Sequence, residues 1–265
     1  MRTPTCGESP HAGGVRVTGR QKGQGSGGGG GRLGGMAEAE PGRLIAGGRS
    51  ADVYEAGDGR VLRRYRDGRP AAKVAREAEV IAHARAHGVP VPEVFDVAGS
   101  DIVMERADGP TMLDVLGRRP LTYRRQARLL ARLHAVVHAV PAPEWLPAPF
   151  GEGDGAPVLL HRDLHPQNVI LTAGGPVIID WEGAARGPAV ADVAMTWVIV
   201  GFSSVPPAGL SAVAVRAVQA LFTRSFLAAA GPVDRDWMAA AVRLRLNDPH
   251  LLPPERVRLE RLRAA

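Results

Sequence analysis

The feature that most constrains this chain is a polar cluster held between short apolar segments. Residues 160–170 read Leu-His-Arg-Asp-Leu-His-Pro-Gln-Asn-Val-Ile, and residues 177–182 read Val-Ile-Ile-Asp-Trp-Glu. Short apolar runs of this kind are typical of buried strands, so the polar residues between them are predicted to lie in rigid loops. Asp163, Asn168 and Asp180 then supply three oxygen donors from one small region. Hard oxygen ligands, completed by water and phosphate oxygens, are what Mg²⁺ prefers.

The segments around this cluster predict an α+β fold with a sheet-rich front and a mainly helical rear. Alternating apolar residues and an Asp58-Gly59 turn predict a hairpin within residues 43–65. Periodicity predicts a helix over 71–87 that ends at Gly88. Further strands are expected near 93–97, 101–105, 158–160, 169–171 and 177–179, and further helices near 111–117, 121–139, 189–201, 209–230, 234–246 and 254–263. For the helix over 121–139 the expected apolar face is Leu129, Leu130, Leu133 and Val136.

Residues 1–35 differ from the rest of the chain. They hold 13 of the 33 glycines and almost no aliphatic side chains, so they cannot bury enough apolar surface to offset the entropy of ordering. We expect a disordered, Gly-rich tail. Met36-Ala-Glu-Ala-Glu has the look of an ordinary start, which leaves open whether translation begins there.

The positive charge is concentrated in this tail. The formal net charge is +6; five basic residues and one acidic residue give residues 1–35 a net charge of +4, which leaves +2 for the rest. Aromatic residues for base stacking are few, so a nucleic-acid partner is not expected. The single cysteine, Cys6, excludes a disulfide framework and fits a reducing, cytoplasmic location. The apolar stretch 193–202 is shorter than the ~20 residues of a membrane span, so no membrane partner is expected.

The order of the motifs resembles that of a known family. His-x-Asp-x-x-x-x-Asn, followed by an apolar strand that ends in Asp, resembles the catalytic and metal-binding loops of the protein-kinase-like superfamily. The finer strings His-x-Asp-Leu-His-Pro-x-Asn and Ile-Asp-Trp-Glu resemble the aminoglycoside phosphotransferase family of small-molecule kinases, as do Leu130-Ala-Arg-Leu-His134 and Asp192-Val-Ala. The resemblance implies a two-lobed protein-kinase-like fold. Residues 36–106 would form a nucleotide-binding lobe, with a small antiparallel sheet and one helix, and residues 107–265 a larger, mainly helical lobe for catalysis and acceptor binding.

The same resemblance implies roles for the loop residues. Asp163 would be the catalytic base, and Asn168 and Asp180 would bind Mg²⁺ on the nucleotide phosphates. His161 is expected to be structural and to hydrogen-bond the backbone near Asp180. Asp192 is expected to accept backbone N–H bonds from the catalytic loop. For His165, two interpretations remain open: it fills the loop, or it lies near the γ-phosphate.

The front lobe fits the superfamily less closely. Gly48 and Ser50 lie in a turn whose backbone N–H groups would cover phosphates. Glu105 begins the segment that would meet adenine through its backbone. Kinase-like folds pair a strand cation with a helix carboxylate, and Glu77 is the natural carboxylate.

The expected strand lysine is absent, and Arg63 takes its place. Lys73, the only lysine after the tail, precedes Glu77 by four residues and is expected to be exposed. Alternation places Val61, Arg63 and Tyr65 on one face of the strand and Arg64 on the other. An arginine can still bridge a carboxylate and phosphates, with a planar fork and a different reach.

Together these features predict an ATP- and Mg²⁺-dependent phosphotransferase that acts on a small-molecule hydroxyl, with GTP left open as the donor. One alternative is a protein kinase. Against it, Asp180-Trp-Glu replaces Asp-Phe-Gly, and Asp192 follows Asp180 by only twelve positions, which leaves no room for an activation segment. Another alternative, raised by Arg63, is a catalytically weak nucleotide-binding module.

The acceptor is expected to be neutral or anionic. Residues 201–265, which would form much of its pocket, carry nine arginines and five acidic residues. A polycationic aminoglycoside would need carboxylates there. Aminoglycosides are therefore predicted to be poor substrates.

Overall fold

The computed structural model describes residues 41–264 apart from Arg49, Asp67, Glu152, Asp154, residues 204–210 and residues 249–250. The tail predicted to be disordered, residues 1–35, lies outside the described residues, and so does the start of the helix expected from 209.

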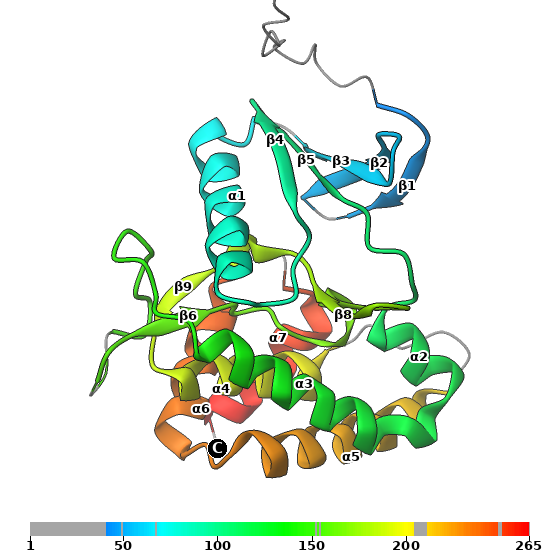
Figure 1. Cartoon of the computed structure of the whole chain (residues 1–265). Helices are drawn as coiled ribbons and strands as arrows, with labels where there is room; N and C mark the ends of the chain where they lie inside the picture. Colours follow the sequence, from blue (N-terminus) through cyan, green and yellow to red (C-terminus); the bar gives the residue numbers. More distant parts are fainter. Residues whose placement is uncertain are drawn as a thin grey trace, which may run out of the picture. The chain divides into compact units, whose positions relative to one another are not determined.

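The N-terminal lobe is an antiparallel sheet with one helix against it (Figure 1). Its strands follow the order β1-β2-β3-β5-β4, and their bounds are β1 Leu44–Gly47, β2 Ala51–Glu55, β3 Arg60–Tyr65, β4 Val94–Ala98 and β5 Asp101–Glu105. The predicted turn joins β2 to β3, where Gly57, Asp58 and Gly59 all have positive φ. The central strand β3 pairs with both β2 and β5, so Arg63 is carried by the middle of the sheet.

Helix α1 (Ala71–Ala86) has its predicted apolar face buried. Val74 and Ala78 pack with Tyr65, Ile102 and Met104 of the sheet. Glu77 lies on the same buried face, whereas Lys73 is exposed as expected. The amphipathic pattern of α1 therefore directs a carboxylate toward β3.

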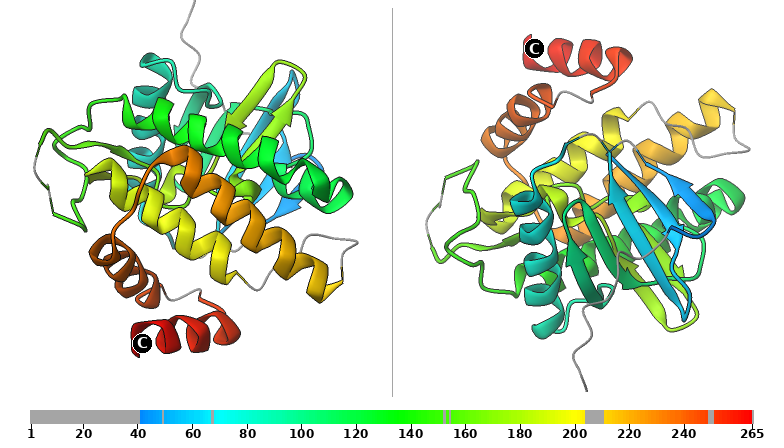
Figure 2. Two further views of the ribbon diagram at one scale, coloured as in Figure 1. Left: turned by 90° about the horizontal axis from the view of Figure 1, so that it is seen from below. Right: turned by 90° about the horizontal axis from the view of Figure 1, so that it is seen from above.

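The C-terminal lobe is mainly helical. Its helices are α2 Met112–Arg118, α3 Tyr123–His138, α4 Ala189–Phe202, α5 Ala212–Ala230, α6 Arg235–Leu246 and α7 Pro253–Ala264. A 3-10 turn at Pro120–Thr122 precedes α3. Figure 2 shows α3, α4 and α5 lying side by side. Leu130 and Leu133 of α3 and Phe222 and Phe226 of α5 belong to the largest hydrophobic core, which also holds Trp181.

One expectation for α3 is wrong: Val136 is exposed. The buried face of the helix follows Leu130, His134 and Val137 instead. At 100° per residue, Val136 lies roughly 120° from the middle of that face. The hydropathy pattern did not indicate this buried face, because a polar residue, His134, occupies a core position.

Two small sheets frame the motif loops. Strand β6 (Val158–Leu160) pairs with β9 (Ala185–Gly187), and β7 (Val169–Thr172) pairs with β8 (Gly175–Ile178). The first loop runs from β6 to β7 and ends in a 3-10 turn at Pro166–Asn168. The second follows β8 and includes a 3-10 turn at Trp181–Gly183. The predicted strand–loop–strand arrangement is confirmed, and β9 was not anticipated.

Helix α5 is long and apolar enough to cross a membrane by length and composition alone. The sequence expectation considered only residues 193–202 and overlooked this helix. Val215, Phe222 and Phe226 of α5 are buried, and the helix packs against α3. Core helices of soluble proteins pass the same test, so this single helix is weak evidence for a membrane span.

Candidate active site

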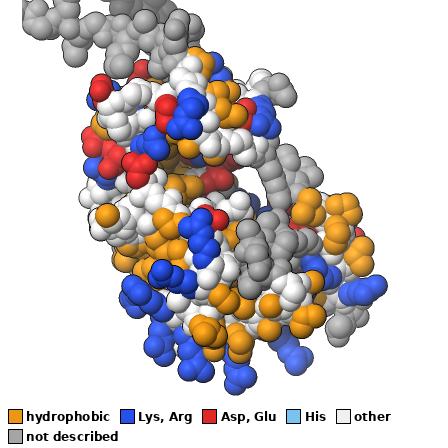
Figure 3. Space-filling model, turned by 90° about the vertical axis from the view of Figure 1, so that its right-hand side faces the viewer, with side chains coloured by type: hydrophobic (Ala, Val, Ile, Leu, Met, Phe, Trp, Pro, Cys, Tyr) orange, Lys and Arg blue, Asp and Glu red, His pale blue; other side chains and the backbone are white. Residues whose placement is uncertain are grey.

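A cleft of about 1190 Å³ is lined by both lobes. Figure 3 shows a hollow with acidic side chains inside it. Residues from the sheet side include Gly48, Ser50, Val53, Val61, Arg63, Met104 and Glu105, and those from the motif loops include Arg162, Asp163, His165, Asn168, Asp180 and Glu182. The cleft thus brings together candidate residues that are more than 100 positions apart in the sequence.

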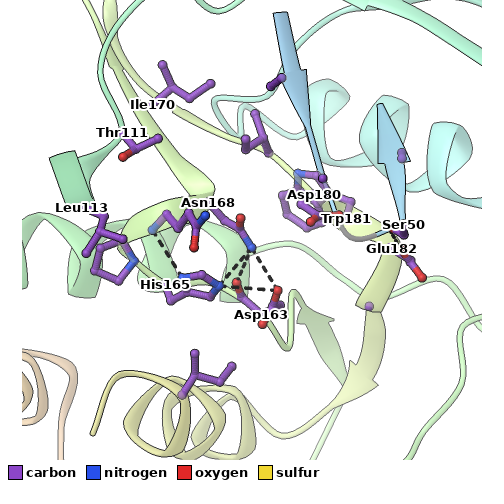
Figure 4. A pocket seen from close by; sticks show the side chains of 18 of the residues that line it. Ser50, Thr111, Leu113, Asp163, His165, Asn168, Ile170, Asp180, Trp181 and Glu182 are labelled. Atoms are coloured by element: carbon purple, nitrogen blue, oxygen red, sulfur yellow. Dashed lines mark hydrogen bonds and ion pairs between the residues drawn. The ribbon is translucent and has the colours of Figure 1, made fainter. Parts of the chain in front are cut away.

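The first loop orients Asp163 and Asn168 toward each other (Figure 4). The Asn168 Nδ2 amide donates to the Asp163 carbonyl oxygen at 2.9 Å and to Asp163 Oδ2 at 3.0 Å. Because the side-chain nitrogen makes both of these hydrogen bonds, the side-chain oxygen Oδ1 of Asn168 remains available as a metal ligand. Both side chains line the cleft.

His165 belongs to the same group. Its Nδ1 accepts a hydrogen bond from the Gln167 amide at 3.3 Å, and its Nε2 lies 3.6 Å from Asp163 Oδ2. A neutral imidazole that accepts at Nδ1 carries its proton on Nε2, so the ring presents this N–H to Asp163. Burial disfavours the charged carboxylate, but the interactions with His165, His161 and Arg245 together outweigh it and hold the pKa of Asp163 below its usual value.

His161 and Asp192 hold the loop from behind. The His161 and Arg162 amides donate to Asp192 Oδ2 and Oδ1 at 3.1 and 2.6 Å. His161 Nε2 lies 3.1 Å from the Ile179 carbonyl oxygen, and its Nδ1 accepts from the Asp163 amide at 3.3 Å. Both contacts expected from the sequence are present. Because both ring nitrogens of His161 are used, this residue has no site left from which to carry a proton to a substrate.

Asp180 begins the second loop in an unusual backbone conformation, with φ and ψ both 67°. Non-glycine residues seldom adopt this left-handed conformation, because it places Cβ near the backbone carbonyl. Trp181 is buried directly after it and packs on His161, with ring centroids 4.6 Å apart. The packing of Trp181 thus anchors the loop that turns Asp180 into the cleft.

Arg63 joins the two lobes of the site. Its Nη1 donates to Glu77 Oε1 at 2.6 Å, and its Nη2 donates to Asp180 Oδ1 at 2.7 Å. The Tyr65 hydroxyl donates to the other oxygen of Glu77. Burial opposes the charge of Arg63, but Glu77 and Asp180 raise its pKa above the usual arginine value. The predicted strand faces are confirmed, since Arg64 pairs with Asp101 instead.

The turn that contains Gly48 and Ser50 is fixed by one backbone hydrogen bond and one side-chain hydrogen bond. The Gly48 amide donates to the Ala51 carbonyl oxygen at 2.8 Å, and a Cβ at position 48 would lie 2.7 Å from that oxygen. This turn therefore requires glycine, and its amide points into the turn rather than into the cleft. Ser50 Oγ donates to Glu182 Oε2 at 3.1 Å, which links the turn to the loop of Asp180.

Glu105 lies where the chain leaves the sheet and lines the cleft as expected. Its own amide donates to the Glu93 carbonyl oxygen at 2.8 Å, and the Arg106 amide donates to the Gly59 carbonyl oxygen at 2.9 Å. Ala107 follows Arg106 in this segment. Its backbone amide has no hydrogen-bond partner among the described residues. No side chain in the sequence indicated that the backbone N–H group of Ala107 would be available as a hydrogen-bond donor.

Arg162 was also not selected from the sequence. It lines the cleft beside Asp163 in a left-handed conformation with φ 67°, and its Nε is buried without a hydrogen-bond partner. Its place between His161 and Asp163 was the available signal, but the arginine-rich composition concealed it.

A comparison with models of protein families identifies the family of this chain. The model described as the phosphotransferase enzyme family matches residues 41–154 and 142–241. The chain belongs to the phosphotransferase enzyme family. The resemblance drawn from the two motifs is thereby confirmed, and both motif loops lie inside the matched region.

Two curated relatives match part of the chain. A probable bifunctional tRNA threonylcarbamoyladenosine biosynthesis protein of Methanoculleus marisnigri is 33% identical over 148 residues, which is 52% of this chain and 24% of that protein. A probable serine/threonine-protein kinase BUD32 homolog of Archaeoglobus fulgidus is 30% identical over 105 residues, which is 40% of this chain and 42% of that protein. The matches span less than half the length of either relative.

Solved structures share the fold of this phosphotransferase family member. Aminoglycoside phosphotransferase APH(4)-Ia aligns with a TM-score of 0.53 at 16% identity, over 77% of this chain and 84% of that one. An ethanolamine kinase of Plasmodium vivax aligns with a TM-score of 0.54 at 11% identity, over 84% and 82%. Amicoumacin kinase hAmiN aligns with a TM-score of 0.52 at 14% identity, over 86% and 88%. The predicted α+β kinase-like fold is therefore confirmed.

Proposed function

We propose that this cleft transfers the γ-phosphoryl group of ATP to a hydroxyl group of a small molecule, with Asp163 as the catalytic base. The observation that carries the proposal is the convergence of Asp163, Asn168 and Asp180 on one cleft, with Arg63 bridging Glu77 and Asp180. Membership of the phosphotransferase enzyme family supports it.

Asp163 is positioned to accept the proton of the acceptor. Asn168 holds its Oδ2, and His165 faces the same oxygen, which leaves Oδ1 for the hydroxyl. In the proposed step the acceptor oxygen forms a bond to the γ-phosphorus as the bond between that phosphorus and the β–γ bridging oxygen breaks. The hydroxyl proton passes to Asp163, and ADP leaves.

The donor set fits a hard divalent cation. Asn168 Oδ1 and the Asp180 carboxylate are oxygen donors, and the left-handed backbone of Asp180 aims it into the cleft that both line. Asn168 and Asp180 would hold Mg²⁺, which, when bound, neutralises charge on the phosphate oxygens. Arg63 donates to Glu77 through Nη1 and to Asp180 through Nη2, and the remaining N–H bonds of these two nitrogens would contact phosphate.

The base of the nucleotide would lie under the sheet. Val53, Val61 and Met104 give that end of the cleft an apolar lining. The Ala107 amide offers a hydrogen-bond donor at its edge, two residues beyond the position expected from the sequence. We propose ATP rather than GTP, because related folds have been solved with AMP-PNP or ADP.

The acceptor end of the cleft supports a neutral or anionic substrate. Arg162 lies there beside Asp163 and makes no ion pair with any described residue. Of the acidic residues at this end, Asp248 pairs with Arg245 at 2.8 Å and Glu255 is buried. A polycation would be repelled by the charge of Arg162, and the Asp248 carboxylate at this end is already engaged by Arg245. Phosphorylation of a kanamycin-like acceptor with a micromolar KM would contradict this part of the proposal.

A second candidate is a protein kinase, and the match to the Archaeoglobus BUD32 homolog favours it. Helix α4 begins at Ala189, only nine positions after Asp180, and the 3-10 turn at Trp181–Gly183 and β9 together occupy most of the interval. This leaves little chain for an activation segment. The decisive comparison is phosphorylation of a protein substrate against phosphorylation of small molecules in the same preparation.

The test is a metabolite-pool screen with γ-labelled ATP and Mg²⁺ that compares the wild type with Asp163→Asn. We expect labelled small-molecule product from the wild type and at least a hundredfold less from the variant. Equal product from both proteins would overturn the assignment of Asp163. Label found only in protein would favour the protein kinase.

A further inference from the structure

A second cluster of potential metal ligands lies behind the catalytic loop. It consists of His134 and His138 of α3 and Asp192 of α4, whose candidate ligand atoms all lie within 4.8 Å of one another. His134 and His138 are four residues apart and therefore share one face of α3. His134 is 1% exposed, Asp192 is fully buried, and the His138 side chain is 10% exposed. None of these side chains lines the cleft.

One atom of this cluster lacks a partner. Thr196 Oγ1 donates to the Leu164 carbonyl oxygen at 2.8 Å and lies 3.0 Å from His134 Nε2. A hydroxyl has one proton, so Thr196 must accept from His134 Nε2–H. The neutral ring then carries its lone pair on Nδ1. This nitrogen is buried without a hydrogen-bond partner.

The unpartnered nitrogen faces another electron-rich atom. His134 Nδ1 lies 3.6 Å from Asp192 Oδ2, and His138 Nε2 lies 3.0 Å from the same oxygen. Two lone pairs directed at each other in a buried site repel, unless a proton or a metal ion lies between them. The two distances to Asp192 Oδ2, 3.0 and 3.6 Å, lie on either side of the separation of about 3.4 Å between ligands at 2.0–2.2 Å in a tetrahedron.

We propose that His134, His138 and Asp192 bind a zinc-class divalent ion, with a water molecule as the fourth ligand. Two imidazoles and one carboxylate suit Zn²⁺ better than Mg²⁺, which prefers oxygen donors. The exposed edge of His138 gives water and the ion a route to the site. Thr196 has the place of the outer hydrogen-bond partner that commonly fixes the tautomer of a metal-binding histidine.

The ion would brace the catalytic loop from behind. Asp192 already accepts the amides of His161 and Arg162. An ion on the same carboxylate would join α3 and α4 to that loop. The site is therefore structural, and it does not depend on the identity of the phosphoryl acceptor.

The test uses the full chain after removal of metals with a chelator. Zn²⁺ or Co²⁺ is added, the bound metal is counted by mass spectrometry, affinity is measured by competition with a chromophoric chelator, and the visible spectrum of the Co²⁺ form is recorded. We expect one Zn²⁺ per chain, a tetrahedral Co²⁺ spectrum, and a higher unfolding temperature with Zn²⁺. In His138→Gln, affinity should fall at least tenfold and the Co²⁺ spectrum should be lost.

The chain offers a matched control. His83 and His87 form another pair four residues apart, on α1, with rings 4.4 Å apart. His83→Gln should keep the stoichiometry and the Co²⁺ spectrum of the wild type. If His138→Gln does not fold, Thr196→Val tests the same site and should weaken Zn²⁺ binding about 10- to 100-fold. Failure of the wild type to bind Zn²⁺, or equal binding by wild type and both site variants, would overturn the proposal.

Discussion

Arg63 Nη2 and Asp180 Oδ1 are joined at 2.7 Å, although the two residues are 117 positions apart in the chain. The other arm of the same guanidinium reaches Glu77 at 2.6 Å. A planar fork can hold two carboxylates in this way, whereas the ammonium group of lysine acts as a point charge. The arginine that replaces the expected lysine therefore fixes the sheet, α1 and the loop of Asp180 together.

The fork of Arg63 gives the first prediction. Arg63→Lys should weaken binding of Mg²⁺·AMP-PNP about tenfold. Lysine lacks the planar fork of arginine and would make one charge-assisted hydrogen bond fewer, which is worth about 1.5 kcal/mol. Isothermal titration calorimetry measures the change. Arg64→Lys is the control, since Arg64 lies on the opposite strand face and pairs with Asp101. Unchanged affinity in Arg63→Lys would mean that Arg63 has no part in nucleotide binding.

The buried phenol of Tyr65 predicts a pH effect. Burial and the neighbouring Glu77 raise the pKa of Tyr65 above its usual value. Because the folded state holds this proton more tightly than the unfolded state, the contribution to stability is complete below pH ~10 and is lost as the pH rises further. The 295 nm absorbance of wild type minus Tyr65→Phe should therefore show phenolate only when the protein unfolds. Phenolate appearing at pH ~10 while the circular dichroism remains native would contradict this.

Gly109 gives a prediction for the segment that links the lobes. A Cβ at this position would collide with the Leu171 carbonyl oxygen. Gly109→Ala should therefore destabilise the protein by about 1–3 kcal/mol through overpacking against β7. Gly174→Ala is the control, because its nearest atom would be at an ordinary 3.7 Å. Urea unfolding of the two variants measures the difference, and equal midpoints would be inconsistent with a close approach at Gly109.

The candidate site was largely predictable where side-chain type and strand pattern agree. Apolar strands on each side of the polar motifs were enough to place Asp163, Asn168 and Asp180 together. Alternation along β3 placed Arg63 and Tyr65 on one face, and Glu77 was expected because kinase-like folds pair a strand cation with a helix carboxylate. In each case the local pattern and the tertiary arrangement follow the same periodicity.

Other features depend on contacts that no local pattern encodes. Burial of His134 rather than Val136 follows from the packing of α3 on α4 and α5, where Thr196 and Asp192 surround the imidazole. The Ala107 amide is available because the amides of Glu105 and Arg106 are used elsewhere. Backbone hydrogen bonds of this kind are set by tertiary pairing, so residue identity carries no signal for them.

We expect Asp163 to act in phosphoryl transfer rather than in nucleotide binding. The most direct measurement takes kcat for phosphoryl transfer and the Kd for Mg²⁺·AMP-PNP on the same preparations of wild type, Asp163→Asn and Asp96→Asn. Asp96 is an exposed control outside the cleft. We predict that Asp163→Asn lowers kcat by about 10²- to 10⁴-fold with Kd unchanged, and that Asp96→Asn changes neither. Equal kcat in wild type and Asp163→Asn, or a loss of activity explained by Kd alone, would exclude Asp163 as the catalytic base.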